Sequence, residues 1–178
     1  MQKQIVDPLD LKTYPAACLR TKTVDVKDFT EETRGMVRAM ADLMYKNQGI
    51  GLAAPQAGLG LSIVIVDAGC GLKVFINPKV VKRSREKDTL EEGCLSLPGV
   101  GVNVARPKEI EIRAKDRDGN VVSGKFDGLE AKAIQHEIAH LYGKLIIDYM
   151  NPVARFISAG RLKREMRKNR FGDTIKVL

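Results

Sequence analysis

The sequence predicts an α+β fold in which small, mostly antiparallel β-sheets pack around one central helix. Two observations predict this class. Short β-branched and hairpin-like segments dominate residues 62–126, and a stretch of helical periodicity follows at residues 129–142. Further helices are expected near both ends. A chain of 178 residues with 44% hydrophobic residues can close one core, so residues 1–178 are expected to form a single catalytic domain.

The first predicted helix, the N-terminal one, covers residues 28–48. Asp28 and Glu31 have the form of a capping box, and Gly49 is expected to end the helix. Its apolar residues recur at helical spacing, which predicts a face that packs in the core: Met36, Val37, Met40, Leu43 and Met44.

Short strands are predicted after a glycine-rich loop at residues 49–60. The β-branched residues of the first strands indicate buried positions. Asp118-Gly119 is a strong signal for a turn between two further strands. The predicted strands are residues 62–66, 73–76, 78–81, 110–115 and 121–126.

Two more helices are predicted. The central one covers residues 129–142, with Gly143 at the expected end. The last begins after Asn151, which is a good N-cap, with Pro152 at the first helical position. Basic residues surround the apolar positions of this C-terminal helix: Arg155, Arg161, Lys163, Arg164, Arg167 and Lys168.

Bulk properties limit the class of protein. No stretch reaches the roughly 20 apolar residues of a membrane-spanning helix, and no secretory signal is expected. Three widely spaced cysteines do not form a disulfide framework. We therefore expect a cytoplasmic protein without a membrane partner. The formal net charge of +8 fits an acidic partner such as nucleic acid, or only a solvated basic face.

The most specific pattern is the segment Gln135-His136-Glu137-Ile138-Ala139-His140, an H-E-x-x-H motif inside a predicted helix. Side chains four residues apart lie on one helical face, so both imidazoles can point at one ion. Glu137 then lies beside that ion, where a carboxylate takes a proton from metal-bound water. The sequence contains only these two histidines, which favours a metal site over chance placement.

Two histidines leave a catalytic metal short of a third protein ligand. Ile146 stands where a metzincin would carry its third histidine. A carboxylate from Glu165 or Asp148 would instead make the protein an H-E-x-x-H zinc peptidase. Cys94 is the preferred candidate, because its surroundings are polar and rich in turns, unlike those of a packing cysteine. Cys70, in a loop between two glycines, stays open.

Three segments of the sequence coincide with one family. They are Gly49-Ile50-Gly51-Leu52-Ala53-Ala54-Pro55-Gln56, Glu92-Gly93-Cys94-Leu95-Ser96, and the segment from Gln135 to His140. In order and approximate spacing they resemble the signature motifs of the peptide deformylases. The resemblance extends from Tyr14-Pro15 to the terminal helix, so it covers nearly the whole chain.

The resemblance implies that the protein removes the formyl group from the formyl-methionine of newly synthesised polypeptides and releases formate. It also implies one divalent ion per chain, held by Cys94, His136 and His140. Fe²⁺ is the expected metal by resemblance, and Zn²⁺, Ni²⁺ or Co²⁺ would also suit a thiolate and two imidazoles. Glu137 would act as general base and then return the proton to the departing amine.

The same resemblance implies two donors for the oxyanion that develops on the formyl group. They are the backbone N–H of Leu95 and the side-chain amide of Gln56. In the loop before Gln56, Gly49, Ile50 and Gly51 would bind substrate, with Gly51 allowing its backbone to pass closely. An ordinary connecting loop is the other interpretation of that segment.

A pocket for the methionine side chain would be lined by Ile50, Leu129 and Ala133. Ala133 and Leu129 lie about one and two turns before His136 on the same predicted helix. Ordinary core packing is an equally good interpretation of these three residues.

Two positions depart from the family pattern. Ala139 stands where members usually carry aspartate, although no ligand and no base is lost. We expect Arg106, which matches a common family arginine, to lack a carboxylate partner for that reason. Ala139→Asp is then expected to improve metal retention or activity. Gly101 replaces a bulkier residue, which leaves the preference beyond methionine open.

Two other functions remain open from the sequence. One is the zinc peptidase with Glu165 or Asp148 as third ligand. The other is a protein without enzymatic activity that binds RNA or the ribosome, as the net charge would allow. A deformylase meets chains as they leave the ribosome, so the basic C-terminal helix is also a candidate docking surface for it.

Overall fold

The computed structural model describes residues 9–169, without the side chains of residues 161–163 and 165–169. Within that range the chain forms α-helices, β-strands and short 3₁₀ helices. In chain order they are η1 (Ala17–Arg20), α1 (Glu31–Lys46), β1 (Gly51–Ala53), η2 (Ala54–Ala57), β2 (Ile63–Val66), β3 (Lys73–Arg83), β4 (Lys87–Glu92), β5 (Val102–Pro107), β6 (Ile110–Lys115), β7 (Val121–Phe126), α2 (Gly128–Leu141), η3 (Ile146–Tyr149) and α3 (Pro152–Asn169).

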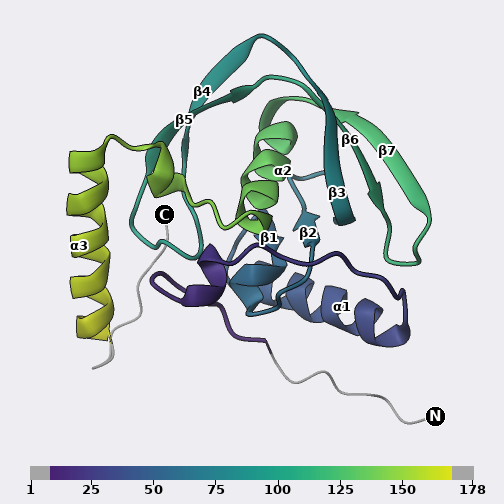
Figure 1. Ribbon diagram of the computed structural model, residues 1–178, viewed down its shortest axis with the longest axis horizontal. Coiled ribbons are helices and arrows are strands. Elements are labelled where there is room, and N and C mark those ends of the chain that lie inside the picture. The colour runs from purple at the N-terminus through teal and green to yellow at the C-terminus, as the bar shows by residue number, and fades with distance from the viewer. Residues whose placement is uncertain (1–8, 170–178) are drawn as a thin grey trace.

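Two antiparallel sheets surround helix α2. One sheet has five strands in the order β1-β2-β3-β6-β7, and the other is the hairpin β4-β5. In Figure 1 the long chain segments between the two sheets arch over α2, with β4 and β5 on one side of it and β3, β6 and β7 on the other. The predicted α+β class, with mostly antiparallel sheets around the H-E-x-x-H helix, is confirmed.

Helix α1 begins three residues later than predicted. The predicted capping box is wrong, because Thr30 is the N-cap residue and no side chain caps the helix. The Glu31 carboxylate instead accepts hydrogen bonds from Arg34 and Arg38 within the helix. At the other end the left-handed position is taken by Gln48, with φ of 56°, and the Gly49 N–H donates to the Met44 carbonyl.

Strand β3 joins two segments that the sequence predicted as separate strands. The pairing register with β6 shifts between Ile76 and Lys79, at Pro78, which has no N–H to donate to a neighbouring strand. Asn77 lies in the left-handed region with φ of 52°, and its side chain exchanges two hydrogen bonds with the Val26 backbone. The irregularity is therefore held in place by contacts outside the sheet.

The hairpin β4-β5 was not predicted. In β5 the inward positions alternate with exposed ones, so Val102, Val104 and Arg106 are buried. Together with η3 and the segment after β4, β5 encloses a third, smaller apolar cluster that includes Cys94 and Leu97. This hairpin carries the chain directly to Cys94.

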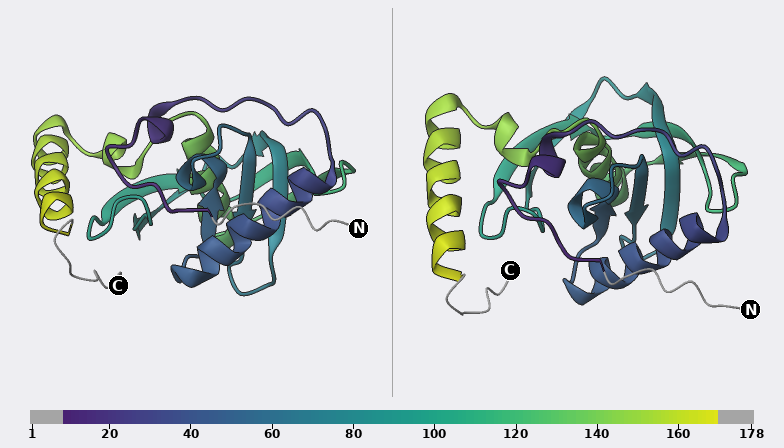
Figure 2. Two further views of the ribbon diagram at one scale, coloured as in Figure 1. Left: turned by 90° about the horizontal axis from the view of Figure 1, so that it is seen from below. Right: turned by 60° about the horizontal axis from the view of Figure 1, so that its bottom comes forward.

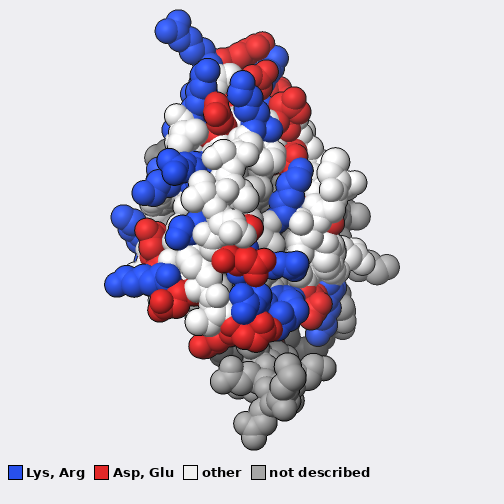
Figure 3. Space-filling model, turned by 90° about the vertical axis from the view of Figure 1, so that its right-hand side faces the viewer, with Lys and Arg blue, Asp and Glu red and all other residues white. Residues whose placement is uncertain are grey.

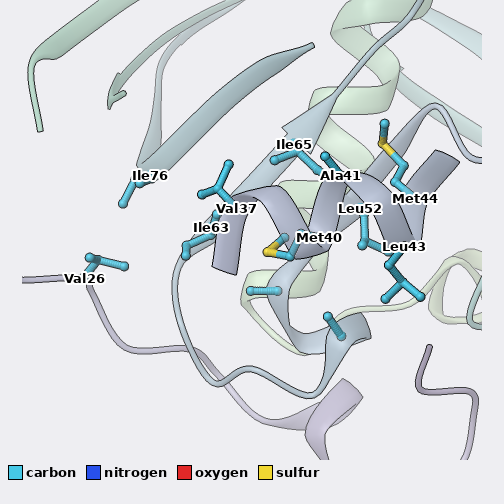
Figure 4. Packing of buried hydrophobic residues seen from close by; sticks show 12 residues of the cluster. Val26, Val37, Met40, Ala41, Leu43, Met44, Leu52, Ile63, Ile65 and Ile76 are labelled. Atoms are coloured by element: carbon cyan, nitrogen blue, oxygen red, sulfur yellow. The ribbon is translucent and has the colours of Figure 1, made fainter. Parts of the chain in front are cut away.

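One of the two larger hydrophobic clusters lies between α1 and strands β1 and β2. Figure 4 shows the α1 side chains pointing into it, among them Val37, Met40 and Met44, with Ile63 and Ile65 from β2 facing them. A second cluster packs the apolar residues of α2 against the five-stranded sheet. The two clusters pack α2 and the β1-η2 segment into the same fold, and these elements carry functional residues described below.

Helix α3 stands apart from the rest of the fold in Figures 1 and 2. Its first turns leave Val153, Phe156 and Ile157 exposed. The predicted N-cap is confirmed, since the Asn151 side chain accepts a hydrogen bond from the Ala154 N–H. None of the helices within residues 9–169 has the length and apolar character that crossing a membrane requires.

Candidate metal centre

Helix α2 and the segment after β4 bring three donor atoms together. His136 Nε2 lies 3.3 Å from His140 Nε2, which in turn lies 3.3 Å from Cys94 Sγ. The three side chains are buried, and their donor atoms all lie within 4.8 Å of one another. Within the described part of the chain, this is the one cluster of cysteine, histidine and carboxylate side chains that could hold a metal ion.

The spacing of these atoms fits a metal ion. Bond lengths of about 2.0 Å to nitrogen and 2.3 Å to sulfur at tetrahedral angles place donor atoms roughly 3.3 to 3.6 Å apart. Both measured separations fall at the lower end of that range. Burial holds the pKa of His140 well below its usual value, so the ring is neutral and its nitrogen can act as a ligand.

The ring of His136 is oriented by a buried carboxylate. Its Nδ1 donates a hydrogen bond of 2.9 Å to Glu92 Oε2, which leaves Nε2 to face the other two donor atoms. Glu92 itself is held by Arg106, whose Nε and Nη2 bind its two oxygens at 2.5 and 2.7 Å. The expectation that Arg106 lacks a carboxylate partner is therefore wrong, because Glu92 from the neighbouring strand supplies one.

This network sets the charge of Glu92. Burial by itself raises the pKa of the carboxyl, but hydrogen bonds from Arg106 and His136 outweigh it and hold the pKa below its usual value. The Arg106 guanidinium also lies 5.2 Å from the centre of the Tyr149 ring. A charged Glu92 is thus kept in place beneath a ring of the metal cluster.

Glu137 lies beside the three donor atoms without joining them. It is 5% exposed, and its Oε2 has no hydrogen-bond partner among the described residues. Burial raises the pKa of Glu137 to about 7, which is close to the value that suits a general base at neutral pH. Gly51 permits this position, because a Cβ there would lie 2.6 Å from Glu137 Oε1.

Gln56 and Leu95 approach the cluster from two different elements. Gln56 in η2 is 1% exposed; its Oε1 accepts from the Ala53 N–H, and its Nε2 lies 3.2 Å from Ser96 Oγ and 3.6 Å from Cys94 Sγ. The N–H of Leu95 donates to no backbone carbonyl within residues 9–169. Both donors therefore lie next to the cysteine of the cluster.

A pocket of about 260 Å³ opens beside the cluster, and every residue predicted to bind substrate lines it: Gly49, Ile50, Gly51, Leu129 and Ala133. Ile50 and Leu129 are 44% and 51% exposed, which argues against core packing as their role, whereas Ala133 is buried. The sequence did not predict Lys132, which also lines the pocket and binds Asp88 of β4 at 2.6 Å.

The sequence analysis also missed the β4-β5 hairpin that contributes to this pocket. Alternation of apolar and polar residues at 102–107 was a signal for its second strand.

The other proposed third ligands lie elsewhere or are not described. Asp148 pairs with Arg20 at 2.5 Å and with Arg155 at 3.0 Å. Cys70 is exposed in a loop and lies outside the cluster. The side chain of Glu165 lies outside the described residues.

Known proteins resemble this chain over most of its length. A family model described as polypeptide deformylase matches residues 8–156. A peptide deformylase of Syntrophobacter fumaroxidans is 41% identical over 90% of this chain and 96% of its own. One of Psychrobacter cryohalolentis is 37% identical over 95% and 89%.

Solved structures agree with the sequence comparison. A peptide deformylase from Legionella pneumophila superposes with a TM-score of 0.87 at 32% identity, and the match covers 93% of this chain and 99% of that one. A peptide deformylase from Synechococcus elongatus, in complex with actinonin, gives 0.83 at 36% identity over 91% and 90%. The fold, the buried cysteine–histidine cluster and these likenesses lead to one conclusion: the chain belongs to the peptide deformylase family.

Proposed function

We propose that this deformylase removes formyl groups from formyl-methionyl chains at one metal ion held by Cys94, His136 and His140. The observation that carries the proposal is the convergence of one sulfur and two nitrogens at 3.3 Å steps. When bound there, a divalent ion supplies a Lewis acid and a water of lowered pKa. We also propose that residues 1–178 form a single catalytic domain.

Glu137 is the general base in this proposal. Its unpartnered Oε2 accepts a proton from the attacking water and then delivers it to the amine that leaves. Burial supports both steps, since a carboxyl with a pKa of about 7 can take up and release a proton near neutral pH. The close approach of Gly51 limits Glu137 to one position.

Gln56 and Leu95 stabilise the negative charge that develops on the formyl oxygen. The Gln56 amide is oriented by its hydrogen bond from Ala53, so its Nε2 is preorganised beside Cys94. The Leu95 N–H is free to donate. Removing one such donor costs about 10²- to 10³-fold in turnover. Ile50, Leu129 and Ala133 receive the methionine side chain, while Gly49 and Gly51 line the path of the substrate backbone.

The decisive assay compares a formyl-methionyl peptide with its acetylated counterpart. A hydrogen on the carbonyl carbon fits beside Gly51 and Glu137, whereas a methyl group is larger, so we expect hydrolysis of the formyl peptide alone. Glu137→Gln is expected to lower turnover about 10²- to 10⁴-fold while metal content stays unchanged. Glu32→Gln, at an exposed position of α1, is the control. Full activity of Glu137→Gln would contradict the assigned base.

The ligand set is tested by metal content after purification. Cys94→Ala should lose the metal, whereas Cys18→Ala, Cys70→Ala, Asp148→Asn and Glu165→Gln should keep it. Loss of metal in Asp148→Asn or Glu165→Gln, but not in Cys94→Ala, would favour the zinc peptidase. Fe²⁺ is the proposed native ion, and Zn²⁺, Ni²⁺ and Co²⁺ are the alternatives. Elemental analysis of protein purified without oxygen decides among them.

The proposed partners are formyl-methionyl nascent peptides, met in the cytoplasm as they leave the ribosome. Basic residues of α3 are the proposed contact with ribosomal RNA, and of these Arg164 is exposed while Arg161, Lys163, Arg167 and Lys168 have side chains outside the described residues. Neutralising all five should reduce co-sedimentation with ribosomes at low salt. If neutralising five cations elsewhere reduced it equally, α3 would have no special part.

A further inference from the structure

Helix α2 presents a second face, away from the metal cluster, to another cavity. Gln135, Ile138, Ala139 and Tyr142 follow one another at helical spacing and line a pocket of about 460 Å³. Strands β3, β4 and β5 and the 3₁₀ helix η3 supply its other walls. Strand β4 and helix α2 contribute to the walls of both this pocket and the substrate pocket, but no single residue lines both.

Cationic side chains dominate this second pocket. Arg83, Lys87, Arg106 and Lys144 all line it, and no aspartate or glutamate does. Arg83, Lys87 and Lys144 form no ion pair within residues 9–169. Figure 3 shows a different arrangement on the face drawn there, where acidic and basic side chains are interspersed. Of the four cations, Arg106 is paired with Glu92, whereas Arg83, Lys87 and Lys144 have no carboxylate partner in the described part of the chain.

Arg106 contributes a poorly satisfied buried donor. Its Nε and Nη2 bind Glu92, but Nη1 makes only long contacts, 3.4 Å to the Gln135 carbonyl and 3.5 Å to the Tyr149 hydroxyl. Contacts of that length are weak hydrogen bonds. The residue is 5% exposed, so water can satisfy Nη1 only from within the pocket. An acceptor oxygen in the pocket would complete the hydrogen bonds of the guanidinium.

The shape of the pocket favours a small ligand with a ring. Ala139 lies on the α2 face, and its short side chain leaves the space beside Arg106 open. Tyr142 and Tyr149 line the cavity and are 54% and 44% exposed. Lys22 lies over one ring and Arg106 over the other, so ring edges and hydroxyl groups are the parts that a ligand can contact. A volume of this size suits a small molecule and exceeds what a lone phosphate fills.

We propose that this pocket is an anion site that binds the phosphoryl group of a small phosphorylated molecule. Arg83, Lys87 and Lys144 surround the anion at the rim, and Arg106 Nη1 donates to one of its oxygens from below. Guanidinium and ammonium groups together suit a phosphoryl group, which offers several acceptor oxygens at high charge. The tyrosines contact the remainder of the ligand.

The test measures binding to the zinc-loaded full chain by calorimetry at low salt. The probes are inorganic phosphate, adenosine 5′-monophosphate and adenosine. We expect saturable binding of one monophosphate per chain, weaker binding of phosphate, and none of adenosine. The sequence has no tryptophan, and two of its four tyrosines line the pocket, so a change in tyrosine fluorescence gives an independent signal of binding. If neither inorganic phosphate nor adenosine 5′-monophosphate showed saturable binding, the proposal would be overturned.

Variants separate this pocket from other anion sites. Ala139→Asp places a carboxylate beside Arg106 and should weaken binding of the monophosphate roughly tenfold or more. Ala139→Asn, similar in size but neutral, should weaken it less. Unchanged binding in Ala139→Asp would place the anion elsewhere, including at the metal. Circular dichroism confirms that both variants fold.

A charge-matched pair completes the design. Arg83→Ala with Lys144→Ala should reduce affinity roughly tenfold, because two direct contacts are lost. Lys27→Ala with Lys46→Ala removes the same net charge from exposed positions outside the pocket and should change affinity far less. Equal losses of affinity in the two double variants would mean that net charge alone attracts the anion, and would overturn the proposal. A short RNA that displaced the monophosphate with the same salt dependence in both double variants would also overturn it.

Discussion

Two ion pairs involve the β4-β5 hairpin, one within it and one between it and α2, and they differ in their exposure to solvent. Glu92 and Arg106 have side chains 7% and 6% exposed, and both oxygens of the carboxylate are bound. Lys132 and Asp88 form a single contact, with the lysine 9% and the aspartate 50% exposed. Asp88 lies directly opposite Arg106 in the hairpin, yet Arg106 reaches past it to Glu92.

The comparison explains which pair matters to the metal cluster. Glu92 also binds His136, so the buried pair fixes the orientation of a proposed ligand. A buried charge cannot turn to water when its partner is lost, whereas Asp88 can. Both ion pairs are close contacts, but only loss of the buried pair is expected to disturb the position of His136 in the metal cluster.

The largest expected effect is that of Arg106→Met. It leaves the Glu92 carboxylate buried without a cation, and removing one partner of such a pair costs about 3–5 kcal/mol in the free energy of unfolding. Urea unfolding measures the loss. Lys132→Met, the same kind of change in the half-exposed pair, is the matched variant. Equal losses in both would show that burial does not separate the two pairs.

Glu92→Gln should act on metal affinity. The amide keeps the shape of the side chain but holds the His136 ring less firmly, and loss of such a partner weakens metal binding about 10- to 100-fold. Competition with a chelator gives the dissociation constant. Asp88→Asn, which contacts no residue of the cluster, should leave it unchanged. A metal affinity of Glu92→Gln equal to that of the parent chain would remove Glu92 from the proposed site.

Asp148 offers an intermediate case that can be followed by pH. Hydrogen bonds from Arg20 and the Leu145 N–H outweigh burial and hold the pKa of Asp148 below its ordinary value. Near the ordinary pKa of an aspartate, the unfolded chain therefore binds more protons than the folded one. The free energy of unfolding then falls as the pH drops through that pKa and below it. Asp148→Asn should be less stable than the parent chain above about pH 5, with the difference shrinking toward low pH. A difference independent of pH would contradict the assigned charge.

The smallest expected effect belongs to Asp88→Asn. Half of its side chain is already in water, and the Lys132 ammonium can be solvated from the substrate pocket. The midpoint of thermal unfolding should stay almost unchanged, and added salt should shrink the small difference from the parent chain further. A large loss would mean that the pair clamps the hairpin to α2.

The sequence predicted the bounds of an element well where the residues of that element alone determine them. Helix α2 was placed within one residue at each end, because its apolar period and Gly143 are local properties. The N-terminus of α1 was placed too early, since Asp28 fits the capping pattern but lies outside the helix. Pro78 divided β3 in the prediction, whereas the fold accommodates it as an irregularity held by Asn77.

The two histidines and Glu137 are given by the sequence alone, because spacing on one helix fixes their relative directions whatever surrounds them. That Cys94 lies beside them, that Glu92 orients His136, and that Arg106 has a carboxylate partner were decided by the pairing of β4 with β5. Such contacts join residues more than ten positions apart. Their geometry depends on register and burial, which are properties of the packed chain and not of any single segment.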